Sequence, residues 1–283
     1  MRYPQLCVVV LIMTAAATFG AARATNDLCQ EAAPIATIEF PGATLLCATG
    51  INPQGDIVGR YVAGGVTHAF LLKDNAFHTI DVPGASFTAG RSISPQGDIV
   101  GNYTSGGVGH GFRWTKGVVE TIDVPGASGT TAFGINARGD IAGIVTSGGD
   151  HGYLLRHEVF TTFDYPGASR TQPFGMNSRG DIVGAYTTAG VLHGFLLRDG
   201  EFISIDIPGA SSTGARGINA QGDIVGEYTN SGVTHGFVLS RGEWQPLDVP
   251  GATSTNALGI NESGVVVGSF IAGGVMRGFV TCQ

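Results

Sequence analysis

One internal repeat dominates the chain and restricts what it can fold into. A Pro-Gly-Ala tripeptide recurs at intervals of 42, 42, 41, 42 and 42 residues, beginning at Pro41, Pro83, Pro125, Pro166, Pro208 and Pro250. Each tripeptide is followed by a Gly-Ile-Asn-like triplet, a Gly-Asp-Ile-Val-Gly-like segment, a glycine-rich loop and a His-Gly-Phe-Leu-Leu-like segment. A regular period of about 20 to 50 residues is typical of solenoids and propellers. The six recurrences therefore predict a repeat fold.

Each unit divides into four short β-strands. The first ends in Gly-Ile-Asn, and an Asn-x-x-Gly turn joins it to the second, whose pattern is Asp-Ile-Val-Gly-x-Tyr. The third is the His-Gly-Phe-Leu-Leu segment, and a short turn such as Asp199-Gly200 joins it to the fourth, for example residues 201–207. Pro-Gly then ends the fourth strand, because proline donates no hydrogen bond to a sheet. The 46 glycines and the low share of charged residues, 13%, suit short strands and tight turns.

Four strands in about 40 to 45 residues is the pattern of a propeller blade. A β-solenoid is the alternative, but its coil is usually about 20 to 30 residues long. The sixth unit has no fourth strand, whereas residues 35–40 align with the fourth strands of the other units. We therefore predict an all-β, six-bladed β-propeller of four-stranded antiparallel blades over residues 35–283, closed by an N-terminal strand that completes the last blade.

A histidine on the third strand lies 13 residues before an aspartate on the fourth strand in five units. A turn midway between them would place the two side chains opposite each other. The pairs are His68/Asp81, His110/Asp123, His151/Asp164, His193/Asp206 and His235/Asp248. In the sixth unit Arg277 replaces the histidine and Glu39 replaces the aspartate, so a complementary pair remains where the two ends of the chain would meet. We interpret these pairs as structural, because histidines on separate outer strands cannot converge on one metal ion.

The first 24 residues have the pattern of a secretory signal peptide. Arg2 gives a positive start, a short apolar run follows, and Ala22-Arg23-Ala24 is a small-x-small cleavage pattern. The apolar run is shorter than the roughly 20 residues that span a membrane. We expect cleavage near Ala24, export to the periplasm or the extracellular space, and a lead segment over residues 25–34.

Three cysteines remain after cleavage, and two are expected to pair in an exported protein. Cys29 precedes the donated strand, and Cys282 follows the strand with which it would pair. We predict a Cys29–Cys282 disulfide, which leaves Cys47 as a buried or free thiol.

The charge balance limits the choice of partners. Without Arg2 and Arg23, the 15 basic residues fall to 13, against 22 acidic residues, a net charge of −9. This balance argues against nucleic acid and against anionic lipid as partners. With no second apolar segment, we expect no membrane insertion. We expect a monomer that binds an extracellular protein, a glycan or a small anionic ligand.

The recurring Gly-Ile-Asn-x-x-Gly-Asp-Ile-Val-Gly motif and His68-Ala69-Phe70, His-Gly-Phe in most other units, resemble the HAF-repeat family of probable extracellular bacterial proteins. The resemblance covers about residues 35–282, with departures at Ser92 and Ser94 in the second unit and Val265 and Arg277 in the sixth. It implies export and a repeat scaffold, and it brings no catalytic residues with it.

No catalytic, metal or cofactor site is predicted. The sequence has no Gly-x-Ser-x-Gly, His-Glu-x-x-His or phosphate-loop motif. A second row of aspartates follows the turn glycine and is expected to bond backbone N–H groups of the turn: Asp56, Asp98, Asp140, Asp181 and Asp223.

A functional surface is expected where the units differ. The residue before Gly-Ile-Asn varies and is predicted to open the first strand, ringing the mouth of the channel: Thr49, Arg91, Phe133, Phe174, Arg216 and Leu258. Phe87, Arg170 and Gln172 are placed on the same face, in the preceding loops. Two aromatic residues and two arginines around a cavity suit an anionic or sugar-like ligand. The favoured function is a secreted, non-catalytic binding or structural module, and the alternative is an extracellular propeller hydrolase or lyase acting on a carbohydrate or small metabolite.

Overall fold

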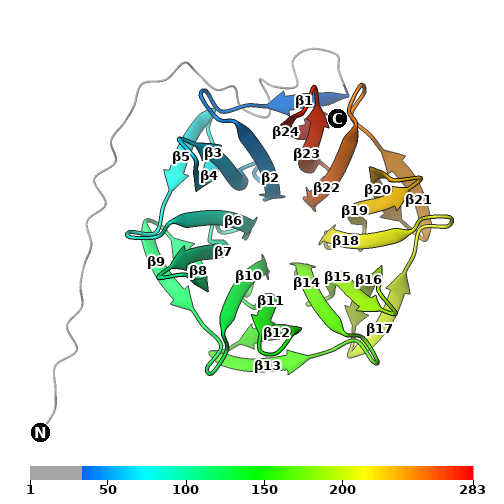
Figure 1. The fold of residues 1–283 in the computed structure, drawn as a ribbon, viewed down its shortest axis with the longest axis horizontal. Helices are drawn as coiled ribbons and strands as arrows, with labels where there is room; N and C mark the ends of the chain where they lie inside the picture. The colour runs from blue at the N-terminus through cyan, green and yellow to red at the C-terminus, as the bar shows by residue number, and fades with distance from the viewer. Residues whose placement is uncertain (1–33, 283) are drawn as a thin grey trace, which may run out of the picture.

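The computed structural model describes residues 34–282 and shows an all-β propeller, with strands arranged radially around a central channel (Figure 1). The predicted signal peptide, Cys29 and all of the lead segment except Pro34 lie outside the described residues. Within the described part, no helix has the length and apolar character needed to cross a membrane.

The first strand of each repeat unit is the innermost, nearest the centre of the ring (Figure 1). These inner strands are β2 (Leu45–Ile51), β6 (Phe87–Ile93), β10 (Gly129–Ile135), β14 (Arg170–Met176), β18 (Ser212–Ile218) and β22 (Ser254–Ile260). The second strands are β3 (Ile57–Ala63), β7 (Ile99–Ser105), β11 (Ile141–Thr146), β15 (Ile182–Thr188), β19 (Ile224–Asn230) and β23 (Val266–Ala272). Each pairs antiparallel with the inner strand before it.

The third and fourth strands form the outer part of the ring. The third strands are β4 (Val66–Lys73), β8 (Val108–Thr115), β12 (Asp150–Arg156), β16 (Val191–Arg198), β20 (Val233–Ser240) and β24 (Val275–Thr281). The outermost are β5 (Ala76–Ile80), β9 (Val118–Ile122), β13 (Val159–Phe163), β17 (Glu201–Ile205), β21 (Glu243–Leu247) and β1 (Ile35–Ile38).

Hydrogen bonding groups the described strands into four four-stranded sheets and one eight-stranded sheet. The eight-stranded sheet contains β2–β5 and β6–β9, joined by a single parallel pairing of Thr67 with Phe87. The predicted all-β propeller is confirmed. The predicted division into six separate four-stranded sheets is not what the hydrogen bonding shows, because this one bridge merges two of the sets.

The two ends of the described chain meet in one sheet, whose strand order is β1-β24-β23-β22. β1 pairs antiparallel with β24, with Ile35 opposite Thr281 and Ile38 opposite Gly278. Ile38 is 1% exposed and packs in the apolar cluster between this sheet and β2. The N-terminal strand therefore supplies the outer strand of the sheet that holds the C-terminal strands, although it is shorter than residues 35–40.

The core lies between neighbouring sheets and is built around one aromatic ring per unit. These fully buried rings belong to Phe70, Phe112, Tyr153, Phe195, Phe237 and Phe279. Each faces a glycine on the second strand. At Gly101 an added Cβ would lie 2.0 Å from the carbonyl oxygen of Ala89 and 2.8 Å from the ring of Phe112. The last glycine of Gly-Asp-Ile-Val-Gly is thus required by this close approach.

The structure brings each predicted histidine to its aspartate. The pairs are His68/Asp81, His110/Asp123, His151/Asp164, His193/Asp206 and His235/Asp248, with Nδ1···carboxylate distances of 2.7 to 3.1 Å. In four of them a tyrosine from the second strand stacks on the imidazole, with ring centroids 5.0 to 5.2 Å apart. Among the described residues, no group of three or more His, Cys, Asp or Glu side chains is placed to hold a metal ion.

The prediction that these aspartates lie on the fourth strand is wrong. Each is the first residue after its outermost strand, outside the ladder and before the Pro-Gly turn: Asp81, Asp123, Asp164, Asp206 and Asp248. In the first unit, for example, the ladder between β4 and β5 ends with Ala69 opposite Ile80. The strand ends early because the chain must already turn toward the inner strand of the next unit.

The same five aspartates are exposed, which limits what the pairs contribute. Their side chains are 44 to 51% exposed, whereas those of the histidines are 23 to 38% exposed. Exposed pairs of this kind typically contribute at most about 1 kcal/mol. The pairs therefore fasten the end of each outer strand to its neighbour at the surface, and they are not part of the core.

Candidate ligand-binding site

The six variable residues predicted to ring the channel are the extra residues of β-bulges. In every unit the register between the first and second strands shifts across this position, for example between Ala48 and Gly50 around Thr49. A bulge leaves one residue outside the ladder and changes the direction of its side chain. The six residues therefore lie at the fifth position of a seven-residue strand, inside the channel. The prediction that they open the strand is wrong.

All six bulge residues line one cavity of about 260 Å³ in the channel. Its remaining lining residues are Cys47, Arg60, Asn256, Ser269 and Met276. A second, smaller cavity of about 90 Å³ lies toward the turns between the first and second strands, and every bulge residue except Phe133 also lines it. The bulge residues thus lie between the two cavities.

Four of the bulge residues, from four consecutive units, form a continuous stack. The guanidinium of Arg91 lies 4.9 Å from the ring centroid of Phe133, and that of Arg216 lies 4.0 Å from the centroid of Phe174. The two rings meet edge to face, with centroids 5.1 Å apart. Cation–π and edge-to-face contacts of this kind are each favourable. They hold both guanidinium groups in place against the channel wall.

The two arginines of the stack differ in how their charge is compensated. Arg216 donates from Nε to both carboxylate oxygens of Glu227, at 2.7 and 2.8 Å, and from Nη2 as well. Burial acts to lower the Arg216 pKa, but the Glu227 carboxylate outweighs burial and the pKa is raised. Arg91 has only the neutral side chain of Asn102, which accepts from Nε at 3.0 Å. Burial, and then the nearby positive charge of Arg60, lowers the Arg91 pKa to about 10, so it stays cationic at neutral pH.

Arg60 adds a second uncompensated charge to the cavity. It lies opposite Cys47 in the β2–β3 ladder and is half-buried. Within residues 34–282 it has no hydrogen-bond or ion-pair partner, and no carboxylate lines the cavity among those residues. The cavity therefore carries the charge of two guanidinium groups in a chain whose overall charge is negative.

Arg60 was not among the residues predicted from sequence, although variation between the units marks its position. It occupies the x position of Gly-x-Tyr on the second strand, which varies across the units as Arg60, Asn102, Ile144, Ala185, Glu227 and Ser269. This position supplies Asn102 and Glu227, the partners of Arg91 and Arg216, as well as Arg60 and Ser269 in the cavity lining. Cys47, which also lines the cavity, is a free, buried thiol.

Three other predicted residues lie apart from this cavity. Phe87 and Arg170 begin inner strands, and Gln172 lies within one, so none is in a loop. Arg170 and Gln172 both donate to Asp150, at 2.6 and 2.8 Å. None of the three lines the cavity.

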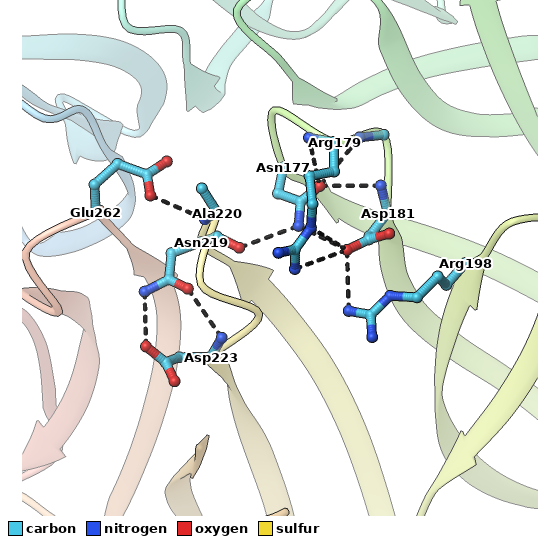
Figure 2. A network of polar contacts seen from close by, with 9 residues as sticks. Asn177, Arg179, Asp181, Arg198, Asn219, Ala220, Asp223 and Glu262 are labelled. Carbon is cyan, nitrogen blue, oxygen red and sulfur yellow. Dashed lines mark hydrogen bonds and ion pairs between the residues drawn. The ribbon is translucent and has the colours of Figure 1, made fainter. Parts of the chain in front are cut away.

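The turns between the first and second strands, which line the smaller cavity, are held by asparagine and aspartate side chains (Figure 2). In the fourth unit Asn177 Oδ1 accepts from the backbone N–H groups of Arg179 and Asp181, while its Nδ2 donates to the Asp181 carboxylate at 2.9 Å. The same Nδ2 donates to the backbone oxygen of Asn219 in the next unit, at 3.1 Å. Asn261 likewise reaches the backbone oxygen of Asn52 at 3.3 Å, joining the last unit to the first.

The prediction that the second row of aspartates bonds backbone N–H groups of the turn is therefore wrong. The asparagine carbonyl oxygen in four units, and the Ser94 hydroxyl in the second, accepts from the turn N–H groups, and the aspartate does not. Asp181 instead accepts from Arg179 and Arg198, and its side chain is 7% exposed. Burial acts to raise the pKa of Asp181, but the bonds from Arg198 and Asn177 outweigh it and the pKa is lowered. Asp140 behaves alike, with Asn136, Arg156 and Arg138 outweighing burial to lower its pKa.

Solved propellers resemble this chain at low identity. A catalytically inactive virginiamycin B lyase from Staphylococcus aureus with quinupristin matches with a TM-score of 0.53 and 14% identity, over 88% of this chain and 99% of that one. A structure provisionally assigned as TolB from Agrobacterium tumefaciens gives 0.58 and 14%, over 84% and 90%. One provisionally assigned as a gluconolactonase gives 0.52 and 15%, over 92% and 97%. Such identities establish the propeller fold alone. No family model matches the chain, and no curated protein matches its sequence.

Proposed function

We propose that this protein binds a small organic anion in the 260 Å³ cavity of its channel. The supporting observation is that Arg60 and Arg91 face this cavity without a carboxylate partner. A buried charge without a counter-charge is unfavourable, and an anionic ligand would relieve that cost. The size is slightly below the roughly 300 Å³ at which drug-sized sites begin, so a metabolite fits better than a large oligomer.

A ligand screen tests this proposal. The purified exported protein would be heated with a panel of organic acids and matched neutral amides or alcohols, and its melting temperature followed. We expect stabilisation by acids only, and loss of that stabilisation in Arg91→Gln. Arg241→Gln is the matched control, because Arg241 is exposed on the turn between β20 and β21. Equal responses to acids and neutral analogues would refute an anion site.

A propeller lyase or hydrolase is the second candidate. Two of the solved structures that resemble this chain are named as enzymes, a virginiamycin B lyase and a gluconolactonase, which favours catalysis over a purely structural module. Incubation with quinupristin and with gluconolactone, followed by mass spectrometry, tests this candidate. Turnover that is lost in Arg91→Gln would make the cavity an active site. Ligand binding with neither substrate consumed would leave the binding function alone.

We also propose that the ring is best counted as six blades. Five of the sets of four strands each correspond to one sequence repeat, and the sixth combines the last repeat with β1. Only the Thr67–Phe87 pairing joins two of the sets. In hydrogen exchange, the amides of this bridge should exchange much faster than those inside β4 and β6. Equal protection would support a single eight-stranded sheet.

We further propose that the protein is exported, as its resemblance to HAF-repeat proteins implies, and that it acts as a monomer outside the cytoplasm. Mass spectrometry of the secreted protein should find an N-terminus near residue 25 and a peptide that links Cys29 to Cys282. A retained N-terminus, or Cys47 in the bridge, would contradict this. Light scattering tests the monomer, and a dimer mass would refute it.

A further inference from the structure

The hydrogen-bond donors left free in the cavity indicate what kind of anion it would hold. A guanidinium has five N–H donors and no acceptor. Arg216 uses Nε and Nη2 on Glu227, and Arg91 uses Nε on Asn102. Both terminal nitrogens of Arg91 and the whole guanidinium of Arg60 remain without described partners. The free donors of the cavity therefore belong mainly to Arg60 and Arg91.

The cavity carries two uncompensated positive charges. The Glu227 carboxylate balances Arg216, whereas nothing among the described lining residues balances Arg60 or Arg91. Both groups line the cavity, and the positive charge of Arg60 acts to lower the Arg91 pKa. A monoanion would compensate one of the two charges, and a dianion would compensate both.

Part of the remaining wall of the cavity is apolar, and Thr49, Asn256 and Ser269 add neutral polar groups. Phe133, Phe174, Leu258 and Met276 line it, and the aromatic stack fixes the guanidinium of Arg91 against Phe133. A preformed guanidinium loses little freedom when it binds a carboxylate or phosphate in a two-pronged contact. The lining thus places one fixed and uncompensated guanidinium, that of Arg91, beside apolar side chains.

We propose that the ligand is a small dianion with an apolar or aromatic body, held by Arg60 and Arg91 together; this inference rests on the proposed binding function. Dicarboxylates and phosphate monoesters share this chemistry. Isophthalate and phenyl phosphate represent the two sources, and benzoate is the monoanion of the same ring.

Calorimetric titration of the wild type and Arg60→Gln with these three probes tests the inference. We expect the wild type to bind one of the dianions about tenfold or more tightly than benzoate, because charge-assisted bonds from a second guanidinium are strong. In Arg60→Gln the ratio of the affinity for the dianion to that for benzoate should fall to about one, and the affinity for benzoate should change little. The better of the two dianions identifies the source. Arg241→Gln should retain the wild-type preference, and melting temperatures no lower than that of the wild type should show that each variant is folded.

Cys47 gives a second measurement that needs no ligand, because its side chain shares the cavity with Arg60. Thiols are alkylated as thiolates, by negatively charged iodoacetate or by neutral iodoacetamide. Peptide mass spectrometry should show a higher iodoacetate-to-iodoacetamide ratio at Cys47 in the folded protein than in the unfolded protein, and a lower ratio in Arg60→Gln.

The two failures are distinguishable. Equal affinity of the wild type for benzoate and both dianions would overturn the dianion inference and leave an anion site in place. Binding of none of the probes, together with no preference of Cys47 for iodoacetate, would remove the proposed binding function as well.

Discussion

Arg277 donates from Nε to Glu39 Oε1 at 2.8 Å, although 238 residues separate the two in sequence. The pair stands where the other units have a histidine and an aspartate, and it lies at the junction of β1 with β24. Its side chains are 33% and 66% exposed. Exposed ion pairs contribute little to stability, so the apolar side chains of β1 should matter more for holding the ring closed.

The first prediction compares two neighbouring residues of this junction. Ile38→Ala removes a side chain that is 1% exposed and should lower the free energy of unfolding by about 2 to 5 kcal/mol. Glu39→Ala should lower it by at most about 1 kcal/mol. Urea denaturation of both variants measures the difference. A larger loss from Glu39→Ala would mean that the ion pair, and not packing, holds the strand.

The second prediction concerns Tyr153, which stands where the other five units have phenylalanine. Its ring is fully buried, and its hydroxyl has no hydrogen-bond partner among the described residues. Burial raises its pKa, so the hydroxyl stays neutral. Tyr153→Phe should stabilise the protein by about 1 kcal/mol, because an unsatisfied buried polar group is removed.

The converse change in the fourth unit is the control for Tyr153. Phe195→Tyr places a hydroxyl at the equivalent buried position and should destabilise the protein by a similar amount. Both are measured by the shift in the urea midpoint. A destabilised Tyr153→Phe variant would show that this hydroxyl has a partner.

The third prediction tests the close approach of the first and second strands. Gly101→Ala would place a Cβ 2.0 Å from the Ala89 carbonyl oxygen and should cost about 3 kcal/mol or more. Gly109→Ala, at the start of β8, meets nothing within 4 Å and should change stability by less than about 0.5 kcal/mol. Thermal unfolding of the two variants measures the contrast. Similar melting temperatures would mean that the sheet adapts to a side chain at residue 101.

The fourth prediction follows from the lowered pKa of Asp181. A carboxyl whose pKa is lower in the folded than in the unfolded protein stabilises the fold above the unfolded value, about 3.9, and this contribution is lost as the pH falls through the lowered value. Asp181→Asn should therefore be less stable than the wild type at pH 7, and the difference should shrink below about pH 4. Denaturant titration across pH 3 to 7 measures it.

A surface aspartate serves as the control for Asp181. Asp74 is exposed on the turn between β4 and β5, at a φ of 48° that asparagine also tolerates. Asp74→Asn should follow the wild type at every pH. A difference between Asp181→Asn and the wild type that does not change with pH would separate its effect from ionisation.

The repeat makes much of this fold predictable from sequence. Because every unit repeats the same strand-forming pattern, the antiparallel order, the histidine–aspartate contacts and the donation of the N-terminal strand all follow from alignment. The Arg277/Glu39 exchange even marks the junction. The bridge between Thr67 and Phe87 was not predictable, because it depends on the relative placement of two neighbouring sheets and on no side-chain pattern.

The ends of the outer strands were less predictable than their pairing. The spacing of 13 residues correctly brought each histidine to its aspartate, but it did not show that the ladder stops one residue before the aspartate. Strand boundaries depend on where backbone hydrogen bonding ceases, which the side-chain pattern alone does not record.

Sequence variation identified which positions line the candidate site, but it did not predict the β-bulge that directs their side chains into the channel. Variation between units singled out Thr49, Arg91, Phe133, Phe174, Arg216 and Leu258, and the structure places all six in one cavity. The bulge that turns them inward has no fixed residue signature, since any side chain can occupy the extra position. The position of Arg60 also varies between units, but it lies on the second strand, and its register opposite Cys47 is what places it beside the cavity.

The bulge also separates packing within the sheet from contact with the channel, which most inner-strand residues would have to combine. A buried residue within the ladder packs against the neighbouring sheet, whereas a bulged residue projects into the channel from outside the ladder. Six such positions, one per repeat, place variable side chains on a constant frame, and four of them contact one another in the Arg91–Phe133–Phe174–Arg216 stack. Chains with this repeat can therefore acquire new ligand preferences by changing a few single residues, while the frame that closes the ring stays the same.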